Sequence, residues 1–563
     1  MLLGIPPGLL LIGGALLIPL MSGHWRKAYM TILPLAGLWA LAGIEHGIYY
    51  EFTFFAYEIV PVRFDSLSLI FGYIFHIAAI LGVIYAWHND DTIEQMAGLA
   101  YAGAGIGALF AGDLITLFVY WEAMAITSVF LIWARRTDES FRAGMRYLLI
   151  QVGSGVLLLS GAIMLAQKTG SIAFEQMTLD GLATWLILIA FGIKCAFPFM
   201  HNWLHDAYPA ATVTGTVFLS AFSTKCAVYA LARGFPGTEL LIYVGAAMTV
   251  FPIFYAVIEN DLRRVLSYSL INQLGFMVVG VGIGTSLAIN GAAAHAFVHI
   301  LYKSLLFMSM GAVLYRVGSA KGSDLGGLYK SMPFTAVFCI VGALSISAAP
   351  LFAGFIAKSL TLSAVGKDGY LLVWLMMMFA SACAFHYCGI KVPYFAFFSS
   401  DSGKRCKEAP LNMLAAMGIT AFLCIAIAVY SPWLYSLLPY PVKYEPYTVS
   451  HVINQSQLLM FSALAFAILI RYKIYPPPIN STNLDFDITY RKWLPAAYRW
   501  FLALTADGWH SILQDLRSGV TRFVKHMFQH HGPEGVLART WPTGSMALWV
   551  AVLLGGFLLI YYF

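Results

Sequence analysis

Long apolar runs separated by short polar segments occupy the chain as far as residue 472, and a last apolar run lies near its end. A helix that crosses the hydrocarbon core of a bilayer needs about 20 apolar residues, so the runs predict about 14–16 transmembrane helices. One sizeable polar stretch, residues 473–542, breaks the series. The candidate runs lie near residues 2–20, 28–47, 66–86, 96–112, 114–134, 144–166, 180–200, 210–233, 239–258, 264–285, 289–315, 334–362, 370–397, 410–438, 455–472 and 543–562.

Composition supports this all-α polytopic membrane class. Hydrophobic residues make up 60% of the chain and charged residues 11%, whereas soluble domains carry about 25% charged residues. This balance excludes a soluble enzyme and a disordered chain. The net charge of +6 fits basic loops of a membrane protein, so no nucleic acid partner is expected. The scattered cysteines lack metal-type spacing and are expected to be buried thiols.

Basic residues in the loops predict the orientation. Loops after odd-numbered runs carry 14 Lys and Arg residues outside the 473–542 stretch, and loops after even-numbered runs carry five. Because basic loops stay in the cytoplasm, the odd-numbered loops are assigned to that side. Both termini are then expected on the outer side of the cell inner membrane. The first run lacks a basic leader and a cleavage site, so it is expected to be a retained span.

The main functional candidates are five ionisable residues inside apolar runs: Glu122, Lys194, Lys225, Lys303 and Lys358. A charge at the bilayer centre costs about 2.5–3.5 kcal/mol on insertion scales. One such lysine could form a structural ion pair or reach a headgroup. Five such ionisable groups, one acid and four lysines, favour an ion or proton pathway.

Two of these runs contain helix breakers. Pro198 follows Lys194, and Pro350 precedes Lys358. Proline removes a backbone donor and clashes with the preceding turn, and paired discontinuous helices are typical of ion sites in transporters. Ordinary proline kinks are the alternative, but a lysine in both runs favours function.

His295, His299 and Lys303 follow one another at intervals of four residues, so they share one helix face. Histidine titrates near neutral pH, which suits a proton relay. A metal site is the alternative, but no carboxylate or cysteine lies nearby in sequence. No cofactor and no metal are expected.

With these residues in place, the chain resembles the antiporter-like membrane subunits shared by respiratory complex I and the Mrp cation/proton antiporters. The resemblance covers most of residues 60–400. The matching stretches are GDLITLFVYWEAM (112–124), FGIKCAFPFMHNWLHDA (191–207), FLSAFSTKCAVYAL (218–231), ENDLRRVLSYSLINQLG (259–275), HAFVHILYKSLLF (295–307) and LFAGFIAK (351–358).

The resemblance implies two inverted five-helix repeats and a role for each candidate residue. Glu122 and Lys194 resemble the essential Glu–Lys pair, and Lys225 resembles the connecting lysine. His295, His299 and Lys303 resemble the central relay, and Lys358 resembles the terminal proton-exit residue.

The subfamily assignment rests on fewer residues. A lysine at position 358 resembles the A-type and D-type Mrp subunits and the largest antiporter-like subunit of complex I, and LDFDITYRKW (484–493) resembles the tail of the D-type Mrp subunits. One stretch departs from the family. In HNWLHDAYPAAT (201–212) His205 and Tyr208 replace the usual proline and histidine, so the chemistry of that loop is open.

Residues 495–531 place apolar side chains on one stripe and charged side chains opposite, which predicts an amphipathic interfacial helix. Gly508 and Gly519 could interrupt it. The segment resembles a shortened lateral helix of the largest complex I subunit. A helix lying on the cytoplasmic face of the same chain is the alternative.

The resulting domain prediction has six parts: N-terminal helices (1–95), first repeat (96–235), second repeat (236–400), C-terminal core helices (401–472), lateral segment (473–542) and final helix (543–563). We predict a proton-translocating subunit of a Mrp-type Na⁺/H⁺ antiporter, without redox chemistry of its own, bound to other membrane subunits and the lipid bilayer. The alternatives are a proton-pumping subunit of an NADH:quinone oxidoreductase or membrane hydrogenase, and a membrane subunit of an inorganic-carbon uptake system.

Overall fold

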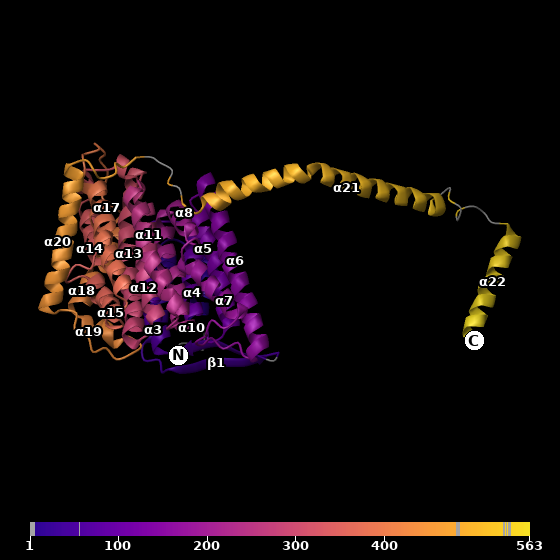
Figure 1. The fold of residues 1–563 in the computed structure, drawn as a ribbon, viewed down its shortest axis with the longest axis horizontal. Coiled ribbons are helices and arrows are strands. Elements are labelled where there is room, and N and C mark those ends of the chain that lie inside the picture. Colours follow the sequence, from indigo (N-terminus) through magenta and orange to yellow (C-terminus); the bar gives the residue numbers. More distant parts are fainter. Residues whose placement is uncertain are drawn as a thin grey trace. The chain divides into compact units, whose positions relative to one another are not determined.

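The computed structural model describes residues 6–55, 57–479, 483, 485–532, 535, 538 and 542–562. The chain divides into two units, residues 1–483 and 484–563 (Figure 1). Unit 1 is mainly a bundle of helices, and the described part of unit 2 contains two long helices. Each unit is described by itself.

The helices of unit 1 account for most of the predicted runs. They are α1 Pro7–Leu16, α2 Gly23–Leu41, α3 Ser66–Tyr85, α4 Thr92–Phe110, α5 Leu114–Trp133, α6 Asp138–Thr169, α7 Leu182–Cys195, α8 Asn202–Ala210, α9 Val213–Ala221, α10 Ser223–Gly234, α11 Glu239–Ile258, α12 Leu262–Ile283, α13 Ser286–Val317, α14 Pro333–Ile346, α15 Ala353–Lys367, α16 Leu371–Ala384, α17 Lys391–Pro393, α18 Leu411–Val429, α19 Ser431–Ser436 and α20 Val449–Arg471.

In the described residues, eleven helices are long and apolar enough to cross a membrane, and three further apolar helices have 10–17 residues. The short ones are α1, α7 and α14, and two of them end at the predicted breaks. The prediction of a polytopic helical membrane protein is therefore confirmed. The first predicted run, 2–20, is shorter as a helix, and its residues 2–5 lie outside the described part.

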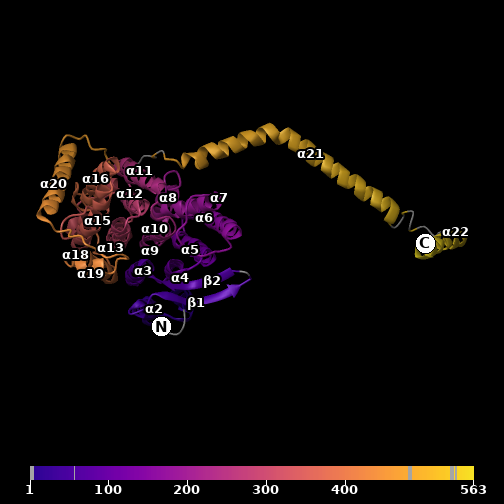
Figure 2. The ribbon, with the colours of Figure 1, turned by 60° about the horizontal axis from the view of Figure 1, so that its bottom comes forward.

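A β-hairpin departs from the all-α prediction. Strands β1 Gly47–Phe54 and β2 Tyr57–Phe64 pair antiparallel and lie beside α4 and α5, as Figure 2 shows along one edge of unit 1. Aromatic and β-branched residues dominate both strands, which favours extended structure. The hairpin is anchored because Gly112 N donates to Val60 O at 2.8 Å and Val60 N donates to Asp113 Oδ2 at 2.9 Å.

Two stretches of unit 1 make the same backbone contacts, and their equivalent residues are 148 positions apart in the sequence. Helices α6 and α13 each have 32 residues and end at a left-handed glycine, Gly170 or Gly318. The chain after each helix then pairs with the start of an earlier helix. The matching backbone bonds are Leu114 N to Ile172 O and Phe174 N to Gly112 O in the first stretch, and Leu262 N to Ala320 O and Gly322 N to Asn260 O in the second, all at 2.9 Å.

These contacts support an internal duplication, and the inversion of one repeat relative to the other stays a prediction. Helices α12 and α13 are almost completely buried in the middle of unit 1 (Figure 1). By contrast, α6 keeps an exposed apolar side. The candidate residues on α13 therefore lie in the most enclosed part of the bundle.

Unit 2 contains α21 Leu494–His531, which has 38 residues, and α22 Thr543–Tyr562. The predicted helix over 495–531 is present, and it continues through Gly508 and Gly519. The lateral placement of this helix remains a prediction. The apolar stripe of α21 is exposed at Phe501, Leu504, Ile512, Leu513, Leu516, Val520, Phe523, Val524 and Met527.

Candidate functional site

Helix breaks occur at both predicted positions, with the same backbone conformation. After α7, Ala196 and Phe199 adopt φ of +62° and +69°; after α14, Ala348 and Leu351 adopt +56° and +71°. Each pair brackets a proline in an Ala-x-Pro sequence. Left-handed conformations in such residues cost about 1–3 kcal/mol each and occur mostly at functional sites.

Backbone bonds around the two breaks also match. Phe197 N donates to Gly192 O at 3.0 Å, and Ala349 N donates to Leu344 O at 3.1 Å. Each bond spans five residues and closes a wide turn instead of an ordinary α-helical turn. The breaks are therefore formed turns of defined geometry rather than simple proline kinks.

Lys194, one residue before the end of α7, is completely buried. Its Nζ donates to Trp121 O at 2.8 Å and lies 4.8 Å from the centre of the Trp121 ring. Trp121 directly precedes Glu122 on α5. The structure thus brings Lys194 next to the part of α5 that carries the predicted acid partner.

Glu122 is half-buried and lies against α6 at Gly155. A methyl group on Gly155 would fall 1.5 Å from Glu122 Oε1, so glycine leaves the space for the carboxylate. The Lys194 ammonium lies in the electrostatic field of this carboxylate. No direct ion pair joins Glu122 to Lys194 among the described residues, so a switchable pair stays a prediction.

Lys225 lies beside a helix break that the sequence did not reveal. Helices α9 and α10 are interrupted at Phe222, and Lys225 Nζ donates to Ser220 O at 2.5 Å across the interruption. The sequence SAFSTK contains no proline or glycine. Serine and threonine, which bond to nearby backbone groups, were the only local signal.

The predicted relay on α13 is completely buried. His295 Nε2 lies 2.9 Å from the Tyr302 hydroxyl and 3.2 Å from Gln273 Oε1. Both nitrogens of His299 and Nζ of Lys303 have no hydrogen-bond partner in the described part of the chain. Buried polar groups are normally paired with protein or water, so this region has the polar surface to hold water.

Tyr302 and Gln273 are relay neighbours that sequence reasoning missed. Both stand in quoted motifs, HILYK and SLINQLG, but neither is charged, so a search for ionisable residues passed over them. Lys225 lies within electrostatic range of His299 and Lys303. The structure therefore brings Lys225 and the α13 row together.

Lys358, on α15, is buried against the second break. Its Nζ donates to Ile346 O at 2.6 Å and lies 5.2 Å from the centre of the Phe276 ring. Lys358 also lies within electrostatic range of His295 and His299. The candidates thus form two groups, Glu122 with Lys194, and Lys225 with Lys358 and the α13 row.

Two other buried cations were not among the candidates. Lys391 Nζ donates to Ala256 O, Val257 O and Glu259 O at 2.7–2.9 Å, which satisfies all three of its hydrogens at the end of α11. Arg263 Nη1 donates to Pro209 O at 2.9 Å. Both side chains hold helix ends together, and this role explains them without ion transfer.

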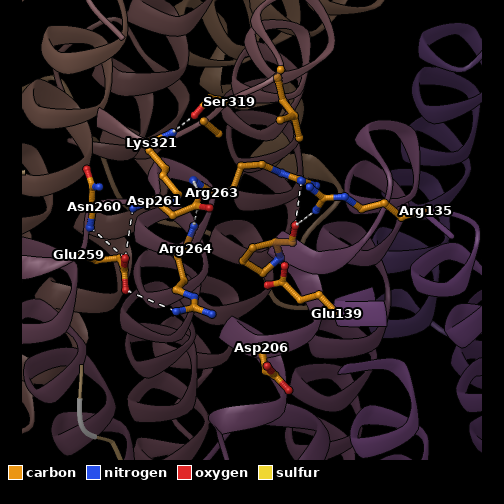
Figure 3. Close-up of a pocket in the computed structure, with 14 residues that line it drawn as sticks. Arg135, Glu139, Asp206, Glu259, Asn260, Asp261, Arg263, Arg264, Ser319 and Lys321 are labelled. Atoms are coloured by element: carbon orange, nitrogen blue, oxygen red, sulfur yellow. Dashed lines mark hydrogen bonds and ion pairs between the residues drawn. The ribbon is translucent and has the colours of Figure 1, made fainter. Parts of the chain in front are cut away.

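A charged cavity of about 460 Å³ opens where α8, α12 and α13 meet the loops assigned to the cytoplasm (Figure 3). We call this cavity the vestibule. Side chains of both signs gather round it, which attracts water. Its charged lining residues are Arg135, Glu139, Asp206, Glu259, Asp261, Arg263, Arg264 and Lys321.

Hydrogen bonds fix the floor of the vestibule. Arg135 Nη1 and Arg263 Nη1 both donate to Pro209 O, at 2.7 and 2.9 Å. Asp206 on the same helix accepts two bonds from Arg146, at 2.7 and 3.1 Å. These bonds hold helix α8 at the side of the vestibule.

Comparison with known proteins agrees with this arrangement. Residues 111–384 match the family described as NADH:quinone oxidoreductase/Mrp antiporter, transmembrane. The chain is 27% identical over 431 residues to hydrogenase-4 component B of Escherichia coli, covering 68% of this chain and 64% of the relative. It is 30% identical over 325 residues to the D-type subunit of the Na⁺/H⁺ antiporter of Alkalihalophilus pseudofirmus, covering 53% and 66%. The chain thus spans about two thirds of the length of these relatives.

Solved structures show the same fold. The Mrp complex from Dietzia sp. DQ12-45-1b matches with a TM-score of 0.76 at 21% identity, over 92% of this chain and 62% of that chain. The archaeal membrane-bound sulfane sulfur reductase matches with a TM-score of 0.71 at 23% identity, over 99% of both chains. The chain is a polytopic membrane protein that belongs to the family of antiporter-like membrane subunits shared by Mrp antiporters and complex I.

Proposed function

We propose that the chain is the proton-translocating subunit of a multi-subunit Mrp-type Na⁺/H⁺ antiporter. The observation that carries this proposal is the series of buried lysines held by carbonyl oxygens beside helix breaks. Lys194, Lys225 and Lys358 each donate to a backbone carbonyl. Buried ammonium groups without a carboxylate in contact are costly at membrane depth, and proton transfer gives them a function.

The pathway we propose runs through the seven sequence candidates in order along the bundle. Glu122 and Lys194 receive or release charge at the α5 side. Lys225, His299 and Lys303 carry the proton through the middle, His295 and its partners hold the row in place, and Lys358 exchanges the proton on the outer side. Relatedness to a Na⁺/H⁺ antiporter supports sodium as the counter-ion.

Partner subunits belong to this proposal. The relatives named above include one subunit from an antiporter and one component of a hydrogenase. In unit 2, the exposed apolar stripe of α21 offers a surface for a neighbouring membrane subunit or for lipid. We place the assembly in the cell inner membrane, with both termini on the outer side.

The test uses the intact complex purified through a tag on this chain and reconstituted in vesicles with a pH-sensitive dye inside. A sodium gradient alone should drive proton flux, and vesicles holding this chain alone should show none. Robust flux from the isolated chain would contradict the need for partners. A complex that ignores sodium at every pH would contradict the antiporter assignment.

A second candidate function is proton pumping within a redox complex. The match to the sulfane sulfur reductase over 99% of both chains favours it. In that case the purified complex would contain redox subunits, and proton flux would require an electron donor. The same vesicle assay, run with and without the donor, separates the two functions.

A further inference from the structure

Two buried residues, Gln273 on α12 and Tyr302 on α13, hold one nitrogen of His295. Nε2 of His295 lies 2.9 Å from the Tyr302 hydroxyl and 3.2 Å from Gln273 Oε1, and the hydroxyl donates to the same Gln273 oxygen at 3.2 Å. Nδ1 of His295 makes no hydrogen bond to any described residue. The two ring nitrogens therefore have different surroundings, and this difference decides where the ring can exchange a proton.

A backbone carbonyl fixes which end of the Gln273 amide faces the ring. Asn272 Nδ2 donates to Thr249 O on α11 at 2.5 Å. A carbonyl oxygen can only accept, so the NH₂ group of Asn272 faces α11 and its Oδ1 faces Gln273. Gln273 Nε2 donates to this Oδ1 at 2.6 Å. The Gln273 amide is therefore turned with its Oε1 toward His295.

The anchor of these bonds lies where the backbones of α11 and α12 are in close contact. A methyl group added to Gly275 would fall 2.7 Å from both Thr249 N and Gly245 O, so glycine allows the two helices to approach this closely. Asn272 lies one turn before Gly275, and Asn272, Gln273 and Thr249 are completely buried. Buried polar groups depend on their protein partners, so the amide of Gln273 keeps this orientation.

The orientation of Gln273 determines which nitrogen of a neutral His295 carries the proton. A neutral imidazole has one N–H donor and one acceptor nitrogen. With the proton on Nε2, the Gln273 oxygen accepts from both the ring and Tyr302. With the proton on Nδ1, the Nε2 lone pair would face the Gln273 oxygen, and the Tyr302 hydroxyl could donate to only one of these two acceptors. A buried acceptor would then lack a donor, which is unfavourable.

We propose that Gln273 is a positioning residue that keeps neutral His295 protonated on Nε2, so that the ring takes up and releases the relayed proton at Nδ1 alone. This inference rests on the proposed function and gives His295 a proton-storing role in it. On uptake, an O–H bond of a hydronium ion breaks to leave water, an N–H bond forms at Nδ1, and the imidazole becomes an imidazolium. Release reverses these steps at the same atom, because the Gln273 oxygen accepts a hydrogen bond without taking the proton.

His299 differs from His295 in this respect. Neither nitrogen of His299 has a hydrogen-bond partner in the described part of the chain, so a proton can enter at one nitrogen and leave from the other. The centres of the two rings lie 6.0 Å apart. One histidine thus passes protons on, and its neighbour holds a proton to one side of the route.

The position of the proton on His295 can be measured without transport. Solid-state NMR of the intact complex labelled with ¹⁵N-histidine distinguishes the two tautomers in alkaline buffer, and His295→Asn identifies the resonances of His295 by their loss. The wild-type ring should carry its proton on Nε2. Gln273→Met removes the amide oxygen and keeps an unbranched side chain. Tyr302 can then donate to Nε2, so the proton should move to Nδ1.

Tyr302→Phe is the matched control, because it also removes one hydrogen-bond partner of the same nitrogen. Gln273 Oε1 still accepts from Nε2 in this variant, so the proton should stay on Nε2. In reconstituted vesicles, Gln273→Met should lower sodium-driven proton flux at least about tenfold, and Tyr302→Phe should lower it less. If Gln273 only packs α12 against α13, both variants lose thermal stability and neither changes the tautomer.

Three results would overturn the inference: a proton on Nδ1 of wild-type His295 in alkaline buffer, an unchanged tautomer in Gln273→Met, or normal flux in Gln273→Met with the proton moved. The wild-type spectrum decides the placement of the proton even if the variant does not assemble. The expected tautomers in a wild-type complex without sodium-driven flux would overturn the proposed function and leave the proton placement standing.

Discussion

The stretches α5–α7 and α12–α14 of unit 1 share a backbone but carry opposite chemistry at equivalent places. Glu122 is the ninth residue of α5, and Leu270 is the ninth residue of α12. Gly155 is the eighteenth residue of α6, and Lys303 is the eighteenth residue of α13. An acid beside a glycine in the first stretch is thus replaced by a leucine and a lysine in the second.

Glu122 and Lys303 also differ in how deeply they are buried. Helix α5 leaves Glu122 partly exposed, whereas Lys303 is completely buried. The shared backbone gives each stretch a helix break and a left-handed glycine at the end of its long helix. It also gives each stretch backbone hydrogen bonds to the start of an earlier helix. Under the proposed function, the side chains decide whether a stretch exchanges charge with its surroundings or passes it through the interior.

The largest effect is expected from Glu122→Gln, which deletes the only acid of this comparison. Without the carboxylate, the Lys194 ammonium loses its stabilising field, so proton flux should fall by about 100-fold or more. Glu122→Asp should keep part of the flux. Flux is measured in reconstituted complexes, with assembly checked on native gels. Wild-type flux from an assembled Glu122→Gln complex would show that the acid is structural.

Lys358→Arg tests the second break. Guanidinium does not lose its proton in proteins, so this variant should lose about as much flux as Lys358→Ala, roughly tenfold or more. Assembly should be intact, because Ile346 O keeps a donor. Near-normal flux in the arginine variant would remove Lys358 from the proton path.

Gly155→Ala adds a side chain to the first stretch at the position where the second stretch carries Lys303. The new methyl group would overlap Glu122 Oε1 and push the carboxylate away from α6, so flux should fall about threefold to tenfold with a stability loss of about 1–3 kcal/mol. Gly153→Ala is the matched control, because an added methyl group there meets nothing within 4 Å. Equal behaviour of both variants would show that the niche is unimportant.

Lys391→Met separates a lysine that holds helix ends from one that moves protons. The change leaves three carbonyls of the α11 end without their donor, so the complex should lose about 3 kcal/mol of stability. Flux per assembled complex should change less than in Lys358→Arg. Thermal unfolding in detergent provides the measurement, with the exposed Lys367→Met as control. A stable but inactive Lys391→Met complex would place Lys391 in the pathway.

Asp65 lies at the start of α3, outside the membrane spans. Its replacement should have the smallest effect of these variants, and that effect should depend on pH. Burial opposes its ionisation, but Arg233, at 2.5 Å, and the Ser68 amide hold the pKa of Asp65 below its ordinary value. The stabilisation is present above about pH 4 and is lost as the pH falls through the lowered pKa. Asp65→Asn should therefore cost about 1 kcal/mol at pH 7 and much less in acid, as measured by thermal unfolding. A cost that is the same at both pH values would point to packing instead of charge.

The sequence was sufficient to locate two of the helix breaks and the lysines buried beside them. Lysines in apolar runs stand out because their burial is costly, and Pro198 and Pro350 are local breakers. The hairpin at 47–64 was not predicted, because its two strands of eight residues each are too short to register as membrane-spanning runs.

Other features depend on tertiary contacts that one sequence does not display. The break at Phe222 depends on Tyr101, 121 residues away, which accepts the freed Ser223 N–H. The space for Glu122 depends on a glycine of another helix. Lys391 also lies in an apolar run, and the three carbonyls that it binds indicate a structural role.

The lysines at the breaks are held by carbonyl oxygens, and this choice of partner affects how readily they discharge. A carboxylate in contact would bind the ammonium far more strongly than the free amine and would trap the proton. A carbonyl carries no net charge, and an amine that has lost its proton still has N–H groups to donate. Lys194, Lys225 and Lys358 can therefore keep the same anchor in both states. Proton exchange then requires little rearrangement of the surrounding helices, so many cycles can pass without the bundle being rebuilt.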